Sequence, residues 1–432
     1  MKMKMNKITF TLFYRNRLTR WHLTMIAVMF LFSCENDSYI PPFEKVEYNK
    51  FADQLFEKEV NLKEDIERNL HEFGIESWEE LLSGKENEYK DFKSGIEKLD
   101  LFLKLVPKYT IHGITYHTID PNGNPVLASG VIYYPKRIKP KGVILISPTL
   151  KTKGGCGTDM QLAYEAFPGL IGYVCIIPDG IGLGTTSHLP IAFMQHDNTV
   201  RISIDMQIAT KEFLHNHYRY DMPQETFLLG YSLGGHGIWG VARYYQQHPE
   251  LGFRTNHIFV GGGAYQPELA METILKFDHT PYAVAPYIIW SFDQYENLGL
   301  DFTRIFKGKL LGGMPGLCNG DKSIIWTTSY LGTDVHEYMA DDFLSNKEDP
   351  QKHLILEVLK KNTIPNDWKP GAKIHLYHSS NDSIVPTICG DRLNDYLKSV
   401  NANVTYHKLD QSHYDCFISM TLDFFNFLRT KK

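Results

Sequence analysis

The chain has 432 residues and a formal net charge of −5, with 43% hydrophobic and 13% aromatic residues. This composition excludes a disordered or fibrous protein and is sufficient for at least one large buried core. A mildly acidic chain is a poor binder of nucleic acid. We find neither a basic stripe nor a Cys/His cluster with the spacing of zinc ligands. The sequence therefore predicts no nucleic-acid partner and no metal site.

Residues 1–33 have the pattern of a targeting segment. A basic region ends at Arg20, and the apolar stretch from Leu23 to Phe32 is too short to span a bilayer comfortably. The sequence then resembles a bacterial lipobox in which Cys34 is lipidated, and an ordinary cleaved signal peptide is the alternative. Residues 34–50 are interpreted as a polar tether. We therefore expect a lipid anchor in the envelope of a Gram-negative bacterium, on the periplasmic face or the cell surface, and removal of the basic leader changes the net charge to −11.

The sequence pattern changes near residue 108. Residues 51–107 mix charged and apolar side chains at helical spacing, which predicts a helical N-terminal segment. Two runs rich in β-branched and aromatic residues, 109–119 and 126–134, then flank the turn signal Pro121-Asn122-Gly123. This pattern predicts a β-hairpin.

Beyond the hairpin, strands alternate with amphipathic helices, and several strands are continuous apolar runs. Such runs are typical of a parallel sheet that is covered on both faces. The predicted strands are 142–147, 172–177, 226–229, 258–261, 373–377 and 404–409. The order predicts an α/β fold with a mostly parallel, doubly wound sheet preceded by an antiparallel hairpin.

One interval interrupts this alternation. About a hundred residues, 265–370, separate two sheet strands that are normally joined by a much shorter connection. We interpret this interval as an inserted helical cap, so that the core comprises residues 108–264 and 371–432. Its aromatic residues either line a substrate pocket or form the core of the cap, and both interpretations stay open. They are Tyr282, Tyr287, Trp290, Phe292 and Tyr295.

The strongest chemical signal is the pentapeptide Gly230-Tyr231-Ser232-Leu233-Gly234 between a predicted strand and a predicted helix. This G-x-S-x-G pattern is typical of a sharp turn that exposes a nucleophilic serine, with glycines where side chains would collide with backbone. The position at a helix N-terminus also directs the Leu233 amide toward a developing negative charge. We therefore predict that Ser232 is a nucleophile and that Leu233 supplies one oxyanion-hole amide.

A serine nucleophile needs a base within hydrogen-bond reach and an acid that orients the base. In a sheet of this kind the chain order is Ser, then Asp or Glu, then His. Asp382 follows the strand at 373–377, and His413 follows the last strand at 404–409. We predict that Asp382 is the orienting acid and His413 the base. Asp410 and Asp415 are competing acids that lie close to His413 in sequence.

A second oxyanion donor is expected in the loop after the first parallel strand, Ser147-Pro148-Thr149-Leu150. Proline has no amide hydrogen, so Pro148 is excluded. The amide of Thr149 or that of Leu150 is the predicted donor. The Pro178-Asp179-Gly180 segment lacks the glycine spacing of a dinucleotide site, and we interpret it as structural.

Together these segments resemble the secretory lipase, or lipase-A-like, branch of the α/β-hydrolases. The resemblance extends over residues 109–428 and rests on five features. They are the hairpin with Gly123 and Ala128-Ser129-Gly130, the Pro178-Asp179-Gly180 segment, the serine motif continued by Gly235-His236, the helical insertion, and the closing loops with Asp382 and His413. It implies a lid over the active site and hydrolysis of carboxylic esters without metal or organic cofactor. The usual His-Gly pair is absent from the loop at residues 148–150, which leaves the oxyanion geometry and the substrate shape open.

Three functions remain in competition. The first is a serine hydrolase that cleaves a small-molecule, lipid or glycan ester through an acyl-enzyme. The second is a serine peptidase with the same catalytic groups, although the chain has no propeller-like repeat of the kind that gates many such enzymes. The third is a catalytically silent lipoprotein that binds a ligand at the surface. The sequence does not predict the oligomeric state.

Overall fold

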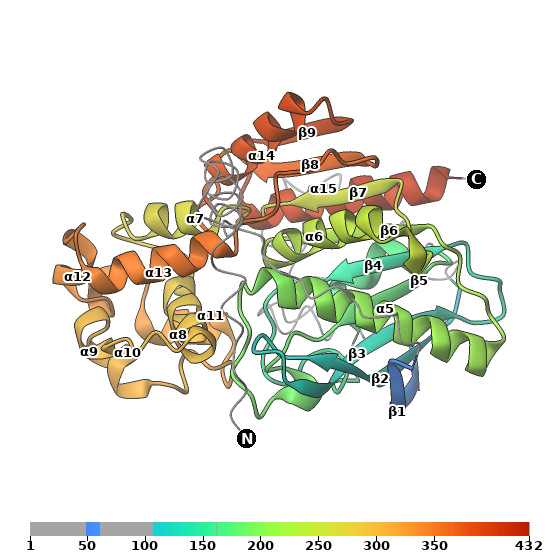
Figure 1. Ribbon diagram of the computed structural model, residues 1–432, viewed down its shortest axis with the longest axis horizontal. Coiled ribbons are helices and arrows are strands. Elements are labelled where there is room, and N and C mark those ends of the chain that lie inside the picture. The colour runs from blue at the N-terminus through green and yellow to red at the C-terminus, as the bar shows by residue number, and fades with distance from the viewer. Residues whose placement is uncertain (1–48, 61–106, 161, 432) are drawn as a thin grey trace, which may run out of the picture. The chain divides into compact units, whose positions relative to one another are not determined.

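The computed structural model describes residues 49–60, 107–160 and 162–431. Its centre is a nine-stranded sheet in the order β1-β2-β3-β5-β4-β6-β7-β8-β9 (Figure 1). The strands are β1 (Phe51–Glu59), β2 (Tyr109–Ile119), β3 (Pro125–Pro135), β4 (Val143–Ser147), β5 (Val174–Pro178), β6 (Thr226–Tyr231), β7 (His257–Gly261), β8 (Lys373–Ser379) and β9 (Val404–Leu409). The predicted hairpin is formed by β2 and β3, which pair antiparallel from Tyr109 opposite Pro135 to Ile119 opposite Pro125.

Six neighbouring strands pair parallel, in the order β5, β4, β6, β7, β8 and β9. The strand β3 pairs antiparallel with β5. The predicted α/β class, with an antiparallel hairpin leading into a parallel sheet, is therefore confirmed. The burial of β4 and β5 on both faces accounts for their continuous apolar sequences.

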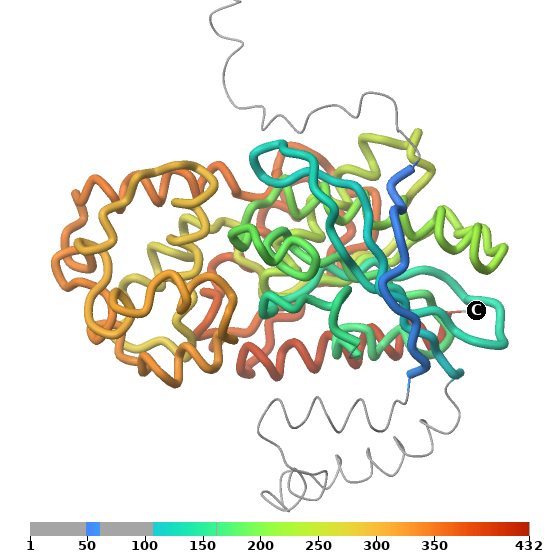
Figure 2. Tube along the Cα trace, turned by 90° about the horizontal axis from the view of Figure 1, so that it is seen from below, coloured from blue at the N-terminus to red at the C-terminus, as the bar shows by residue number. Residues whose placement is uncertain are grey.

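The helical prediction for residues 51–107 is wrong at its beginning, because Phe51–Glu59 forms the edge strand β1 (Figure 2). The half-buried residues of this strand alternate with exposed ones from Gln54 onward, as expected for a sheet edge with one covered face. Phe56 lies on the covered face against Gly113, where a larger residue would leave no room for the ring. Residues 61–106 of the predicted helical segment lie outside the described residues.

Helices cover both faces of the sheet. On one face α15 (His413–Thr430) and the 3-10 helix η1 (Tyr164–Gly169) pack against a continuous apolar cluster that includes Ile144, Cys175 and Phe259. On the other face lie α5 (His196–Tyr218), α6 (Leu233–Gln247) and α14 (Ile388–Ser399) (Figure 1). The sheet is therefore doubly wound. The cysteines at 156, 175, 318, 389 and 416 are all buried free thiols.

The segment between β7 and β8, which we call the helical insertion (residues 265–370), contains seven α-helices and the 3-10 helix η4 (Val335–Glu337). The α-helices are α7 (Pro267–Ile274), α8 (Val284–Glu296), α9 (Phe302–Ile305), α10 (Gly308–Gly313), α11 (Ile324–Leu331), α12 (Asp341–Ser345) and α13 (Pro350–Lys361). These helices gather beside one end of the sheet in both views (Figures 1 and 2).

The chain leaves the insertion along one side of α6. His236 Nε2 hydrogen-bonds to the Asn362 carbonyl oxygen (2.7 Å), Trp239 Nε1 donates to the Pro365 carbonyl (3.0 Å), and Arg243 pairs with Asp367 (2.7 Å). Residues at this spacing share one face of a helix. The C-terminal end of the insertion is therefore bound to α6, the helix that begins directly after Ser232.

The contacts between α6 and residues 362–367 should contribute unequally to the free energy of unfolding. Trp239 is fully buried, so Trp239→Ala removes its packing and its hydrogen bond, and we expect the free energy of unfolding to fall by about 3–5 kcal/mol. Arg243→Ala is the matched control on the same face, because its partner Asp367 is exposed, and about 1 kcal/mol or less is expected. Urea unfolding followed by circular dichroism measures both losses. Equal losses in the two variants contradict the larger contribution that we assign to Trp239.

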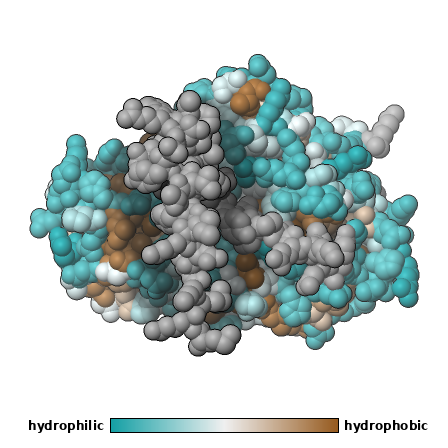
Figure 3. All heavy atoms as spheres, viewed as in Figure 1, coloured by the Kyte–Doolittle hydropathy of each residue, from teal (hydrophilic) through white to brown (hydrophobic). Residues whose placement is uncertain are grey.

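Hydrophilic side chains dominate the described surface in the view of Figure 3. Across residues 49–60, 107–160 and 162–431, we find no helix with both the length and the apolar character needed to cross a bilayer. The same residues contain no cluster of three or more His, Cys, Asp or Glu side chains arranged to bind a metal ion.

Candidate active site

The sheet register brings the three predicted catalytic residues to one edge. Ser147 at the end of β4 lies opposite Gly230, Gly261 at the end of β7 lies opposite Tyr377, and Ser379 at the end of β8 lies opposite Leu409. The carboxyl ends of these parallel strands therefore coincide. Ser232, Asp382 and His413 each follow one of these strand ends within four residues.

Ser232 lies on a strained turn between β6 and α6. Its φ of 56° and ψ of −123° place a non-glycine residue in a region that L-amino acids rarely adopt. The amide of Ser232 donates to the Gly261 carbonyl (2.9 Å), and its own carbonyl accepts from the Gly235 amide (3.0 Å). The surrounding backbone thus holds Ser232, which is half-buried, at the N-terminus of α6.

The turn requires glycine at residues 230 and 234. A Cβ atom on Gly230 would overlap the carbonyl oxygen of Gly234, and one on Gly234 would overlap the carbonyl oxygen of Ser147 at the end of β4. Both obstacles are backbone atoms, which cannot move aside as a flexible side chain can. The first turn of α6 is therefore in direct contact with the start of the loop that follows β4.

We expect Gly234→Ala to displace Ser232, the predicted nucleophile, because the added methyl group pushes α6 away from β4. A shift of about 1 Å at a catalytic group lowers kcat by roughly 100-fold. Gly312→Ala in α10 is the control, since a Cβ there meets nothing within 4 Å. Ester turnover by both purified variants provides the comparison, and wild-type kcat in Gly234→Ala contradicts the proposed tight contact.

His413 and Asp382 form a direct pair. His413 is the first residue of α15, and its Nδ1 lies 2.6 Å from Asp382 Oδ2. The other oxygen of Asp382 accepts the amides of Ile384 (2.9 Å) and Val385 (2.8 Å). Because an ionised carboxylate only accepts hydrogen bonds, Nδ1 of His413 carries the proton. In the tautomer with its proton on Nδ1, the imidazole has its lone pair on Nε2, as a general base requires.

The competing carboxylates have other partners. Asp415 accepts from the Ser412 hydroxyl (2.7 Å) at the start of α15, and Asp410 accepts from the Asn381 side-chain amide. His378 is fully buried, with Nε2 3.0 Å from the Val385 carbonyl oxygen. Asp382 is thus the carboxylate that faces His413.

Tyr231 links the serine turn to the histidine, and sequence reasoning did not identify it. Its hydroxyl donates to the His413 carbonyl oxygen (2.7 Å), and its ring centroid lies 5.0 Å from that of the imidazole. Tyr231 immediately precedes Ser232 and is buried. The residue before Ser232 therefore contacts His413 directly. Tyr231 occupies an x position of the G-x-S-x-G motif, where any residue is allowed, so the motif does not predict this contact.

The two predicted amides after β4 differ in environment. The Thr149 amide donates to Glu165 Oε1 (3.4 Å), so its hydrogen already has a partner within the protein. No hydrogen bond joins the Leu150 amide to another residue of the described chain, and Leu150 is only half-buried. Leu233 begins α6, where the first amides of a helix have no partner within it. Of the predicted donors, Leu233 and Leu150 therefore have amides available to an oxyanion.

The Asp179 carboxylate holds the loop after β4 against the hairpin. It accepts the amides of Cys156 and Gly157 and the hydroxyl of Ser129 (2.6 Å). Burial raises the pKa of Asp179 to about 6, and these hydrogen bonds oppose that rise. The Pro178-Asp179-Gly180 segment thus has a structural role, as interpreted from its sequence.

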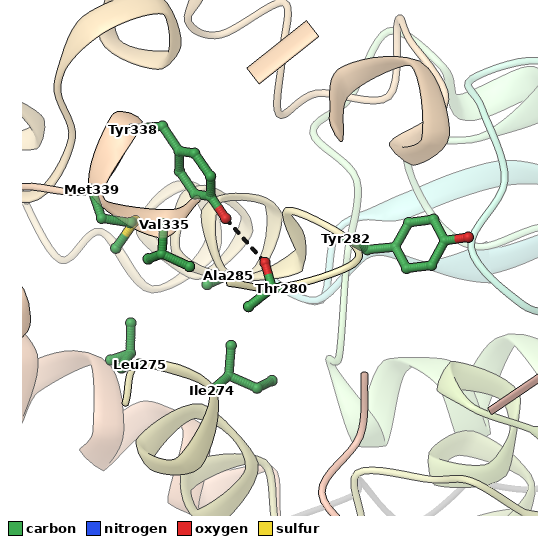
Figure 4. Close-up of a pocket in the computed structure, with 8 residues that line it drawn as sticks. All are labelled: Ile274, Leu275, Thr280, Tyr282, Ala285, Val335, Tyr338 and Met339. Carbon is green, nitrogen blue, oxygen red and sulfur yellow. Dashed lines mark hydrogen bonds between the residues drawn. The ribbon is translucent and has the colours of Figure 1, made fainter. Parts of the chain in front are cut away.

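The helical insertion reaches the site through Tyr282, whose ring lies 5.9 Å from that of Tyr414, the neighbour of His413. Tyr282 lines a pocket in the insertion, but Figure 4 shows its ring directed away from the Thr280–Tyr338 hydrogen bond (3.1 Å). The other lining residues are Ile274, Leu275, Ala285, Val335 and Met339. The four remaining aromatic residues singled out from the sequence are buried, at 287, 290, 292 and 295. Their burial favours a packing role, and the Tyr295 hydroxyl donates to the Pro190 carbonyl oxygen outside the insertion (2.5 Å).

Solved structures of known proteins share this architecture. No family model and no curated protein matches the sequence. A candidate hydrolase from Legionella pneumophila aligns over 76% of this chain and 91% of its own, with a TM-score of 0.65 and 22% identity. The rice cell wall degrading esterase LipA from Xanthomonas oryzae aligns over 75% and 90%, with a TM-score of 0.64 and 20% identity. Candida antarctica lipase A aligns over 73% and 78%, with a TM-score of 0.50 and 14% identity. The chain therefore has the α/β-hydrolase fold.

Proposed function

We propose that the protein is a serine hydrolase that cleaves carboxylic esters through an acyl-enzyme, with Ser232 as nucleophile, His413 as base and Asp382 as orienting acid. The observation that carries the proposal is the 2.6 Å contact between His413 and Asp382, with the His413 ring packed against Tyr231, the residue before the strained Ser232. The esterase and lipase among the structural neighbours support ester hydrolysis as the reaction class.

In this mechanism Ser232 Oγ attacks the ester carbonyl while His413 Nε2 takes the hydroxyl proton. The positive imidazolium is stabilised by the Asp382 carboxylate. The negative oxygen of the tetrahedral intermediate accepts hydrogen bonds from the amides of Leu233 and Leu150, and the N-terminus of α6 favours the same charge. His413 then returns the proton to the leaving alcohol, and water releases the acid by the same steps.

The substrate preference is tested with p-nitrophenyl esters of increasing acyl length beside an aminoacyl p-nitroanilide. The proposal predicts a higher kcat/KM for the esters. A higher kcat/KM for the anilide identifies a serine peptidase instead. Turnover of neither substrate, together with no labelling by a fluorophosphonate, favours the catalytically silent binding protein.

We also propose that Cys34, which lies outside the described residues, anchors the protein to the bacterial membrane. The basic leader and the following apolar stretch support this assignment. In a bacterial host, radiolabelled palmitate should appear in the wild-type protein and be absent from Cys34→Ala. Equal label in the two proteins, or label in neither, contradicts the anchor.

A further inference from the structure

An ion pair with a buried carboxylate joins the loop that follows β4 to the 3-10 helix η1. Lys151 Nζ is 2.8 Å from Glu165 Oε1 and 3.0 Å from Oε2, and the Glu165 side chain is only 3% exposed. Burial alone raises the pKa of Glu165, but the charge of Lys151 and the hydrogen bonds from Lys151 and Thr149 hold it below its usual value. The carboxyl group is thus ionised at neutral pH and acts only as an acceptor.

Thr149 is bound to this carboxylate twice. Its amide lies 3.4 Å and its hydroxyl 2.8 Å from Glu165 Oε1. The hydroxyl group has a single proton, which it gives to Glu165, so the Tyr164 hydroxyl donates to Thr149 Oγ1 over 2.6 Å. The conformation of Thr149 is therefore fixed from its backbone and from its side chain.

This loop lies beside the proposed nucleophile. Gly234, in the first turn of α6, has no space for a Cβ because of the carbonyl oxygen of Ser147, and the Pro148 carbonyl oxygen lies close by. Thr149 and Leu150 continue directly from that contact. The Thr149 amide is held on Glu165, whereas the Leu150 amide has no hydrogen-bond partner among the described residues.

We propose that Glu165 is a positioning residue for the oxyanion hole. By binding the Thr149 amide, Glu165 sets the loop so that the Leu150 amide, together with that of Leu233, receives the oxyanion of the tetrahedral intermediate. Glu165 acts through Thr149 and touches no reacting atom. This inference rests on the proposed acyl-enzyme mechanism and adds the group that holds one of its donors in place.

The test compares two double variants that remove both charges, so that neither leaves an unpaired buried ion. Glu165→Leu with Lys151→Met lacks any acceptor for the Thr149 amide, whereas Glu165→Gln with Lys151→Met keeps one oxygen. With p-nitrophenyl butyrate we expect the Leu variant to lose about 10- to 100-fold in kcat at nearly unchanged KM, somewhat less than deletion of an oxyanion donor. The Gln variant should recover to within about threefold of wild type, because its oxygen replaces the lost acceptor.

Wild-type kcat in the Leu variant, or equal losses in the two double variants, overturns the inference. If the Leu variant does not fold, as judged by circular dichroism, Glu165→Asp replaces it. Aspartate keeps both charges but withdraws the oxygens by about 1.5 Å, one carbon–carbon bond. A lower kcat at unchanged KM supports the positioning role, and unchanged kcat overturns it. A wild-type protein with no more turnover than Ser232→Ala shows instead that the proposed function itself has failed.

Discussion

Ser232→Ala should reduce ester turnover by roughly 10⁴- to 10⁶-fold, because the proposed acyl-enzyme forms on the Ser232 hydroxyl. The hydroxyl is small and lies at a half-buried helix start, so the variant should fold as the wild type does. Alanine has a Cβ atom as serine does, so the substitution neither adds nor removes backbone strain at this positive φ. Initial rates with p-nitrophenyl butyrate, at enzyme concentrations confirmed by absorbance, give the ratio.

A serine far from the site provides the control for this loss. Ser399→Ala at the end of α14 removes only a hydroxyl that donates to the Tyr396 carbonyl, and its turnover should equal that of the wild type. Retention of more than about one hundredth of wild-type kcat by Ser232→Ala is incompatible with a covalent role for this serine.

Asp382→Asn should lower kcat by roughly 10⁴-fold although it changes the shape of the site very little. One carboxylate oxygen of Asp382 accepts the amides of Ile384 and Val385, so the asparagine oxygen must take that position. The asparagine NH₂ group then faces Nδ1 of His413. Two donors cannot bond to each other, so the imidazole changes to the tautomer with its proton on Nε2. That nitrogen can no longer accept the serine proton.

The matched control is Asp410→Asn, in the loop beside His413, because Asp410 binds Asn381 at the surface. Its kcat should stay within about twofold of wild type, since removal of an exposed charge perturbs the site only weakly. The two variants are compared by kcat and KM on one ester. Similar kcat values for both asparagine variants contradict the assignment of Asp382 as the orienting acid.

The fold was largely predictable because its signals are local. Continuous apolar runs bounded by turn residues mark the buried strands, and the pentapeptide around Ser232 marks the passage from β6 to α6. The edge strand β1 was not predicted because it has one covered face and few apolar residues, and its spacing also fits a helix. Pairing with β2, a contact that no local pattern encodes, decides between the two.

The candidate site was also predictable only in part. Ser232, Asp382 and His413 could be proposed because each lies shortly after a recognisable strand, and parallel strands place such loops at one edge. The contact of Tyr231 with His413 and the pairing of Lys151 with Glu165 depend on side-chain packing between segments without periodic pattern. The choice between Thr149 and Leu150 as donor depends on the same packing. Only coordinates resolve these features.

The most direct test of the central claim is covalent labelling of the wild-type protein with a fluorophosphonate, followed by mass spectrometry of its peptides. This reagent reacts with a serine that is deprotonated by a neighbouring base and faces an oxyanion hole. We predict a single adduct on Ser232. An adduct on a different residue, or no adduct on the folded protein, contradicts the proposal that Ser232, His413 and Asp382 act together as a catalytic site.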